Sequence, residues 1–132
     1  MLKTEPLRFN YEFSRVYRRG RGLSDKHVSL HVFERDRYVR RGLRVVDSQI
    51  NRLGVTANRK VRTAVLRNRI RRLQREAYRQ LEHELKPGFD LIFMIKQAED
   101  IPSFSQIVKE MDSLLKRAGV KCVASKGDSS ND

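Results

Sequence analysis

The sequence is short of cysteine and of long apolar runs. Cys122 is its only cysteine among 132 residues, which excludes an internal disulfide and fits a reducing compartment. No apolar run approaches the roughly 20 residues that span a bilayer. Residues 1–10 also lack the apolar stretch of a signal peptide. These absences predict a cytoplasmic protein without a membrane segment.

Residues that build catalytic or metal centres are also scarce. The histidines are His27, His31 and His83, and the first two lie too far apart on one predicted strand to chelate a single metal. There is no Cys/His cluster, no glycine-rich phosphate loop and no pair of carboxylates in a distinct setting. A protein nuclease would normally carry metal-binding carboxylates or a histidine base. We therefore predict no catalytic residue and no metal site in this chain.

Acidic residues are few relative to basic ones. There are 16 of them against 29 lysines and arginines, which gives a formal net charge of +13. Such a charge points to nucleic acid or an anionic membrane as partner. The length corresponds to one domain with a single core, which we place at residues 1–119. Residues 120–132 hold few large apolar side chains and are expected to form a disordered tail.

The basic charge is densest in residues 59–79, RKVRTAVLRNRIRRLQREAYR. Apolar residues at helical spacing form one stripe of this segment, which is typical of a helix docked on a core. The other side carries arginines four residues apart, which repel by roughly 0.2–0.5 kcal/mol per pair in isolated helices. Because surface helices usually mix signs, this ladder favours a polyanionic partner over a solvated face. The stripe is Leu66, Ile70, Leu73, Ala77 and Leu81; the ladder is Arg67, Arg71, Arg75 and Arg79.

A shorter helix is predicted over residues 10–19, with Asn10 as its cap and Gly20 as its stop. Four aromatic residues fall within nine positions here, more than one short helix needs for packing. Aromatic rings interleaved with arginines also suit base stacking, worth roughly 1–3 kcal/mol per base. The segment therefore predicts a core contact and, in part, a nucleic-acid contact. Its aromatic residues are Phe9, Tyr11, Phe13 and Tyr17.

Three strands are predicted. Residues 26–33 alternate with period two, as in a half-buried strand, and residues 21–26 before them are interpreted as a loop. Residues 50–57 form a second strand that leads into the basic helix, which we place at residues 62–85. The nearly continuous apolar run 89–95 predicts a central strand covered on both faces.

The last predicted element is a helix that begins at the capping box of Ser103 and Gln106 and closes at Gly119. The order is helix, strand, strand, helix, strand, helix, which predicts an α/β (α+β) two-layer sandwich with helices on a small sheet. The two strands around the basic helix form a βαβ unit if they are parallel. The arginine-rich connection at residues 34–49 has no assigned role.

The block RLGVTANRKVRTAVLRNRIRRLQREAY, residues 52–78, resembles the protein component of bacterial ribonuclease P. Residues 64–73 closely match the RNR motif of that family, and the likeness extends over residues 7–119. The resemblance implies a fold like the second domain of ribosomal protein S5. It also implies a left-handed crossover around the basic helix, contrary to the right-handed rule for such units.

The resemblance implies a protein subunit of ribonuclease P, the ribonucleoprotein endonuclease that removes the 5′ leader of precursor tRNA. In that family the RNA subunit is the catalyst, while the protein binds this RNA and contacts the leader. The implied partners are therefore the catalytic RNA and precursor tRNA, with neither a membrane nor DNA expected. Magnesium is implied as a requirement of the RNA–protein holoenzyme, with no cofactor bound by the protein alone.

Site residues follow from the same resemblance. The family's leader cleft uses the first helix and a face of the sheet, which implicates Phe13, Tyr17 and His31, the last where other members often have an aromatic residue. One departure is Arg62, at a turn position where the family usually has glycine. The residues expected to face the catalytic RNA are Arg59, Lys60, Arg67, Asn68, Arg69, Arg71, Arg72 and Arg75.

Two other functions share the composition. A structural RNA-binding protein of ribosomal type would have the charge but need not carry the Ala-Val-x-Arg-Asn-Arg block. A DNA-reading helix is disfavoured, because only Asn68 and Gln74 are plausible adenine readers and groove-reading helices usually present their N-terminal residues to bases. Composition and pattern alone predict an RNA- or DNA-binding α/β domain.

Overall fold

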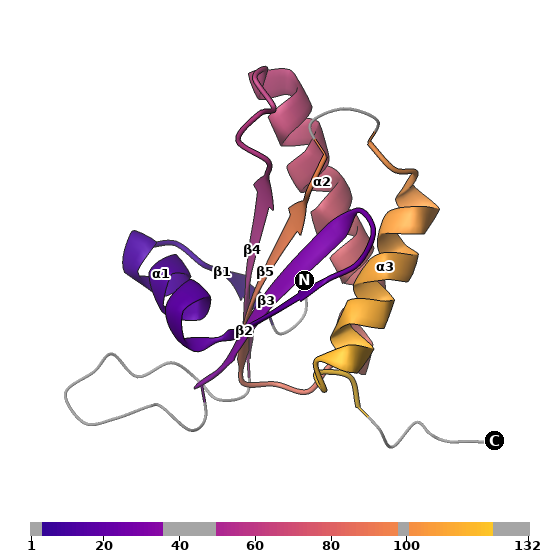
Figure 1. The fold of residues 1–132 in the computed structure, drawn as a ribbon. Coiled ribbons are helices and arrows are strands. Elements are labelled where there is room, and N and C mark those ends of the chain that lie inside the picture. Colours follow the sequence, from indigo (N-terminus) through magenta and orange to yellow (C-terminus); the bar gives the residue numbers. More distant parts are fainter. Residues whose placement is uncertain (1–3, 36–49, 98–100, 123–132) are drawn as a thin grey trace.

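The computed structural model describes residues 4–35, 50–97 and 101–122 of the chain. Within these residues a five-stranded sheet has helices on both faces (Figure 1). The strand order across the sheet is β1-β4-β5-β3-β2. The strands are β1 (Thr4–Pro6), β2 (Arg21–Ser24), β3 (Val28–Glu34), β4 (Asn51–Ala57) and β5 (Phe89–Ile95).

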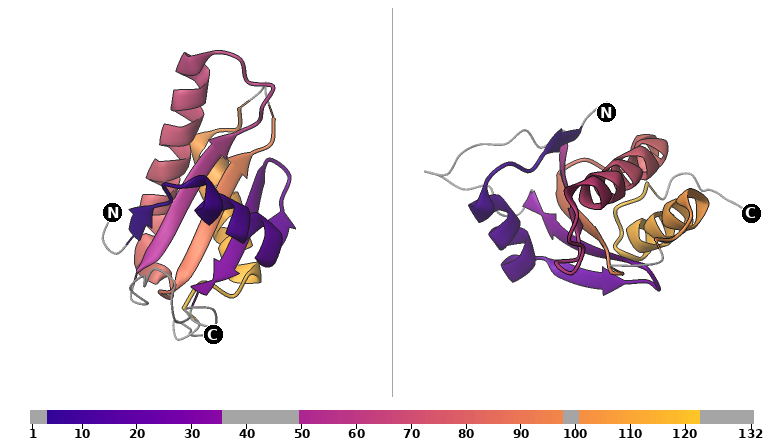
Figure 2. Two further views of the ribbon diagram at one scale, coloured as in Figure 1. Left: turned by 90° about the vertical axis from the view of Figure 1, so that its left-hand side faces the viewer. Right: turned by 90° about the horizontal axis from the view of Figure 1, so that it is seen from above.

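Three α-helices accompany the sheet in the described part of the chain. They are α1 (Asn10–Arg19), α2 (Ala64–Leu81) and α3 (Phe104–Arg117), and the short 3₁₀ helix η2 (Glu82–Glu84) continues α2. α2 and α3 lie side by side on one face of the sheet, and α1 lies across the other (Figures 1 and 2).

The sheet combines parallel and antiparallel pairs. β4 pairs in parallel with both β1 and β5, whereas β3 is antiparallel to both β5 and β2. Since α2 connects β4 to β5, the condition for a βαβ unit is met. This unit is the one whose left-handed crossover the resemblance implies.

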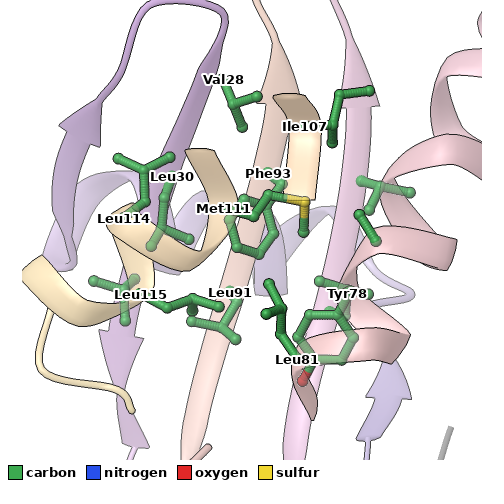
Figure 3. Close-up of a cluster of buried hydrophobic side chains, with 14 of the residues drawn as sticks. Val28, Leu30, Tyr78, Leu81, Leu91, Phe93, Ile107, Met111, Leu114 and Leu115 are labelled. Carbon is green, nitrogen blue, oxygen red and sulfur yellow. The ribbon is translucent and has the colours of Figure 1, made fainter. Parts of the chain in front are cut away.

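The main core fills the space between the sheet and the pair α2 and α3. Leu30, Leu91 and Phe93 point from the sheet toward Ile107 and Met111 of α3, and all five are fully buried (Figure 3). Val28, Leu30 and Val32 of β3 enter this core, which confirms the predicted alternation for that face of the strand. The prediction of a half-buried strand is wrong, because Ser29 and Phe33 on the other face are buried as well, Phe33 against Val16 of α1. Burial of this apolar surface is the main source of stability, at roughly 25 cal/mol per Å².

A smaller apolar cluster lies on the opposite face. Val16 of α1 packs with Leu7, Phe33 and Ile92, and Phe13 borders the group. α1 crosses the strands, and the sheet extends beyond it (Figure 2). One part of this sheet face is therefore left without a helix.

The predicted mixed α/β fold is confirmed, and all six predicted elements are present, but α1 on the second face of the sheet makes three layers where two were predicted (Figure 1). α1 has the predicted bounds, but Phe9 and not Asn10 precedes its first turn as the N-cap residue. The interpretation of residues 21–26 as a loop is wrong, because Arg21–Ser24 forms β2 beside β3. β1 was also not predicted. Both edge strands are too short to show an alternating pattern, and β2 contains a glycine, which is depleted in strands.

Both ends of the long basic helix differ from the prediction of residues 62–85. α2 begins after Thr63, whose Oγ1 accepts a hydrogen bond from the Leu66 N–H at 3.2 Å, and it ends at Leu81 before η2. In the segment expected to be a tail, Val120 is fully buried and Lys121 bridges to Leu85. The fold therefore extends at least to residue 122. Residues 36–49 and 123–132 lie outside the described residues.

Candidate nucleic-acid interface

α2 has one buried face and one exposed basic face. Ile70, Ala77 and Leu81 of the predicted stripe are buried, and Leu66 and Leu73 pack against the core. The basic face is fixed outward because the opposite face is docked on the sheet and on α3. Its exposed residues are Asn68, Arg69, Arg72, Arg75 and Arg79.

The arginines of this face have few acidic neighbours. Arg79 lies 3.7 Å from Glu76 one turn earlier, the only ion pair of α2 among the described residues. No carboxylate in the described part of the chain pairs with Arg69, Arg72 or Arg75. Their guanidinium groups are available for phosphate oxygens, which the planar fork of arginine binds in pairs of hydrogen bonds.

The turn before α2 carries two more predicted RNA-binding residues, Arg59 and Lys60, both exposed. Arg67 supports this turn, because its Nε donates to the carbonyl oxygen of Val61 at 2.8 Å. The Asn58 Oδ1 also accepts the backbone N–H of Lys60 at 2.8 Å. Arg67 is half-buried, so part of its hydrogen-bonding capacity serves the turn and not a ligand. Arg71 is half-buried as well.

Gln74, considered above as a base-reading residue, faces the interior. Its side chain is fully buried, and its Nε2 donates to the carbonyl oxygen of Thr56 on β4 at 2.9 Å. The interpretation of Gln74 as a candidate adenine reader is therefore wrong. It lies four positions after Ile70, about one helical turn, which places it in the apolar stripe despite its polarity.

The three residues predicted to contact the leader lie on one side of α1, against the sheet. The rings of Tyr17 and His31 meet edge to face with their centroids 4.8 Å apart. The Phe13 ring packs closely on β4 at Gly54, where an added Cβ would come within 2.6 Å of the ring. Only glycine at position 54 allows this approach. The fold thus brings Phe13, Tyr17 and His31 together from α1 and β3; we call them the cleft residues.

The ionisation of the cleft residues follows from their partial burial. Burial lowers the pKa of His31 below its ordinary value, so its ring is neutral at pH 7. Burial raises the pKa of Tyr17, against the opposing effect of a hydrogen bond with Thr56. Tyr17 remains 47% exposed. The cleft residues therefore present uncharged aromatic rings, which suits stacking on bases.

A buried ionic network lies beneath α1, and the sequence patterns did not predict it. At its centre is Asp90, with no exposed surface. Its Oδ1 accepts from Arg35 at 2.6 Å, and both of its oxygens accept from Arg52, at 3.0 and 2.9 Å. Arg15 of α1 donates to Oδ2 at 3.1 Å, and Arg52 also bonds Glu12 of α1. We call these five residues the Asp90 network.

The Asp90 network attaches α1 to the sheet. Glu12 accepts the N–H groups of Arg8 and Phe9 at 2.8 and 3.1 Å, so its carboxylate caps the helix N-terminus. Burial tends to raise the pKa of Asp90, but hydrogen bonds and charge from Arg52 and Arg35 hold it below its ordinary value. The one sequence signal for this site was an aspartate within the apolar run of β5.

The described part of the chain forms neither a cluster of metal ligands nor a membrane-spanning helix. No group of three His, Cys, Asp or Glu side chains among these residues could hold a metal ion. Over the same residues, no helix is long and apolar enough to cross a membrane.

Known proteins resemble the chain over most of its length. A family model described as "Ribonuclease P" matches residues 1–119. The ribonuclease P protein component of Clostridium botulinum (strain 657) is 37% identical over 120 residues, which cover 90% of this chain and 98% of the relative. That of Clostridium perfringens (strain SM101) is 36% identical over 115 residues, or 87% and 89% of the two chains.

Solved structures agree in fold. The RNase P protein of Staphylococcus aureus has a TM-score of 0.70 and 24% identity, and the match covers 89% of this chain and 97% of that one. The RNase P protein from Thermotoga maritima has a TM-score of 0.68 and 24% identity, with 86% and 96% covered. At this identity the likeness establishes the fold alone.

Proposed function

Because the chain belongs to the ribonuclease P protein family, we propose that it uses two surfaces on two RNA molecules. The exposed face of α2 binds the catalytic RNA, and the cleft residues bind the 5′ leader of precursor tRNA. As a subunit of ribonuclease P, the protein serves the endonucleolytic maturation of the tRNA 5′ end.

The exposed arginines of α2 support the first contact. Arg69, Arg72 and Arg75 follow one another along a helix face without carboxylate partners in the described residues, which is the observation that carries the proposal. Phosphate contacts of this kind release counterions and supply affinity without reading sequence. Asn68 can add a hydrogen bond to a base or a ribose. Arg59 and Lys60 extend the basic surface to the turn before the helix.

The cleft residues support the second contact. A single-stranded leader has unpaired bases, and aromatic rings bind such bases by stacking with little sequence preference. Tyr17 offers a ring that is about half exposed, and the neutral His31 beside it offers both a ring and a hydrogen-bonding nitrogen. Because α2 and α1 lie on opposite faces of the sheet (Figure 1), the two RNA segments can bind at the same time.

We infer that the RNA subunit carries out catalysis and binds the required magnesium. Among the described residues, no three carboxylate, histidine or cysteine side chains lie close enough together to bind a metal ion. The contribution of the protein is electrostatic: a charge of +13 reduces repulsion between catalytic RNA and substrate. Less magnesium is then needed for the same degree of association. The single cysteine fits the cytoplasm as the place of action.

Cleavage of a 5′-extended precursor tRNA at low magnesium tests this function. The cognate catalytic RNA alone, the protein alone and the two together are compared. We expect efficient cleavage only in the mixture. No stimulation, together with tight binding to another structured RNA, would instead support a structural RNA-binding protein of ribosomal type. Cleavage by the protein alone would contradict the absence of catalytic groups.

Replacing the aromatic cleft residues tests the leader contact. The double variant Phe13→Ala with Tyr17→Ala should weaken binding of precursor tRNA more than binding of mature tRNA, by roughly tenfold or more if one base loses its stacking partner. Equal losses on both RNAs would mean that the rings only pack the core. Circular dichroism of the variant must show the wild-type fold.

A further inference from the structure

Two exposed aromatic rings lie together at the start of α1, outside the cleft. The rings of Phe9 and Tyr11 are stacked with centroids 5.5 Å apart and an interplanar angle of 7°. Phe9 is 48% exposed and Tyr11 is 59% exposed. In the described residues only four large apolar side chains are this exposed, and Phe9, Tyr11 and Tyr17 are three of them. Neither Phe9 nor Tyr11 belongs to an apolar cluster, so core packing does not explain the pair.

The surroundings of the Phe9–Tyr11 pair are basic. Arg8 precedes it and is exposed. Arg18 lies seven residues after Tyr11, two helical turns along the same face of α1, and is exposed as well. The one acidic residue of α1, Glu12, is buried in the Asp90 network. An exposed aromatic surface flanked by arginines and without an exposed acid on its helix is complementary to single-stranded nucleic acid.

The pair also continues the surface proposed for the leader. Phe13 and Tyr17 lie on the sheet side of α1, whereas Tyr11 is turned by about 160° from Phe13 and faces solvent. Phe9 is the N-cap residue, at the N-terminal end of the helix, and its ring stacks on that of Tyr11. An RNA strand that leaves the cleft along α1 toward this end would reach the stacked rings. From Tyr17 to Phe9 the helix rises roughly 12 Å, the length of three or four stacked nucleotides.

We propose that Phe9 and Tyr11 form a second stacking site, which binds a leader nucleotide several positions farther from the cleavage site than those in the cleft. This inference rests on the leader-binding function proposed above. Because both stacked rings are about half exposed, a base can stack on the pair and form a continuous stack with the two rings. The site therefore adds affinity only when the leader is long enough to reach it.

Leader length separates this site from the cleft. The holoenzyme, reconstituted with its cognate catalytic RNA, is titrated with precursor tRNAs whose leaders have about two or about ten nucleotides. The double variant Phe9→Ala with Tyr11→Ala should bind the long-leader substrate roughly 5- to 30-fold more weakly and the short-leader substrate as the wild type does. The variant Phe9→Tyr with Tyr11→Phe, which keeps both rings, should restore the affinity for the long leader.

A matched variant distinguishes stacking from general apolar contact. Phe9→Leu with Tyr11→Leu keeps apolar bulk at both positions but removes the flat rings, and it should lose long-leader affinity as the alanine variant does. If the leucine variant retains full affinity, the stacking proposal is wrong. An equal loss on short and long leaders, a loss of affinity for the catalytic RNA, or a change of protein self-association in sedimentation would each overturn it as well.

The same titration tests the second stacking site independently of the leader contact made by the cleft residues. The variant Phe13→Ala with Tyr17→Ala should already lose affinity on the short leader. If that loss occurs while the Phe9 and Tyr11 variants bind both leaders normally, the cleft stands and the second site is refuted. If the Phe9 and Tyr11 variants lose only long-leader affinity while the cleft variant loses none, the second site stands and the cleft is refuted.

Discussion

The two faces of the sheet are held to their helices by different interactions. On one face, α2 and α3 enclose a cluster of 20 buried apolar residues. On the other face, α1 is held by four buried apolar residues and by the Asp90 network. Apolar packing is roughly proportional to buried area and has no direction, whereas hydrogen-bonded ion pairs fix a particular geometry.

This difference matches what each helix is proposed to offer to RNA. α2 offers a line of like charges, which tolerates small shifts because phosphates are spaced along an RNA strand. α1 offers Phe13 and Tyr17 at defined distances from His31 and Gly54, and stacking on a base requires that the rings stay in place. The Asp90 network, with its directional hydrogen bonds, therefore lies beneath α1, the helix whose side chains must be held in position.

The largest effect on stability is expected when a buried side chain of β5 is truncated to leave a cavity on one or the other face of the sheet. Leu91 and Ile92 are adjacent in β5, similar in size and almost fully buried on opposite faces. Leu91→Ala should cost about 3–5 kcal/mol of unfolding free energy, because the large core cannot collapse into the space. Ile92→Ala should cost about 2–3 kcal/mol, because Ile92 has fewer apolar neighbours to lose in the smaller cluster under α1. Urea denaturation measures both, and equal losses would contradict the comparison.

The next effect concerns the Asp90 network. Asp90→Asn removes the charge that three arginines share, and breaking a buried ion pair costs about 3 kcal/mol or more. Because α1 then loses its anchor, binding of precursor tRNA should fall more than binding of the catalytic RNA. Both affinities are measured at a temperature where the variant is folded.

Glu110→Gln provides the matched control for Asp90→Asn. Glu110 is also a buried carboxylate, but it accepts hydrogen bonds from His27, Val28 and Gln106 at the α3 side of the molecule. Its loss should reduce stability without weakening the binding of precursor tRNA more than the binding of the catalytic RNA. If both variants weaken precursor binding selectively and to the same extent, the network contributes stability and not position.

Sequence patterns predicted the sheet face covered by α2 and α3 better than the face held to α1 by the Asp90 network. The stripe of α2 and the alternation of β3 repeat over several turns or residues, and their apolar members all lie in the main core or pack against it. The Asp90 network has no such signal, since Glu12, Arg52 and Asp90 come from three distant segments and each resembles a surface charge. Gln74 was misjudged because polarity suggested exposure, although its position in the helix period indicated burial. Which arginines contact RNA depends on a partner that the sequence does not contain.

A smaller effect is expected from pH. Burial alone would raise the pKa of Glu110, but hydrogen bonds from Gln106, His27 and the Val28 N–H lower it to about 2. A lowered folded-state pKa means that this stabilisation is complete above the unfolded pKa of about 4.5 and is lost as the pH falls toward 2. The difference in unfolding free energy between wild type and Glu110→Gln should therefore shrink over that range. A difference that stays constant between pH 7 and pH 2 would show that the charge contributes nothing.

The smallest effect on stability is expected from substitutions on the exposed basic face of α2, but these substitutions test RNA binding directly. Arg72 has no carboxylate partner in the described residues, whereas Arg79 lies beside Glu76. Either arginine replaced by alanine should change stability by less than about 0.5 kcal/mol, because both side chains are exposed. If Arg72 contacts a phosphate, Arg72→Ala should reduce the slope of log affinity against log salt for the catalytic RNA by roughly 0.7–0.9.

Arg79→Ala should reduce that slope less, since Glu76 already neutralises part of its charge. An unchanged slope in Arg72→Ala would indicate that the catalytic RNA binds another surface. The proposal that the α2 face binds the catalytic RNA while the α1 face binds the leader would then be wrong.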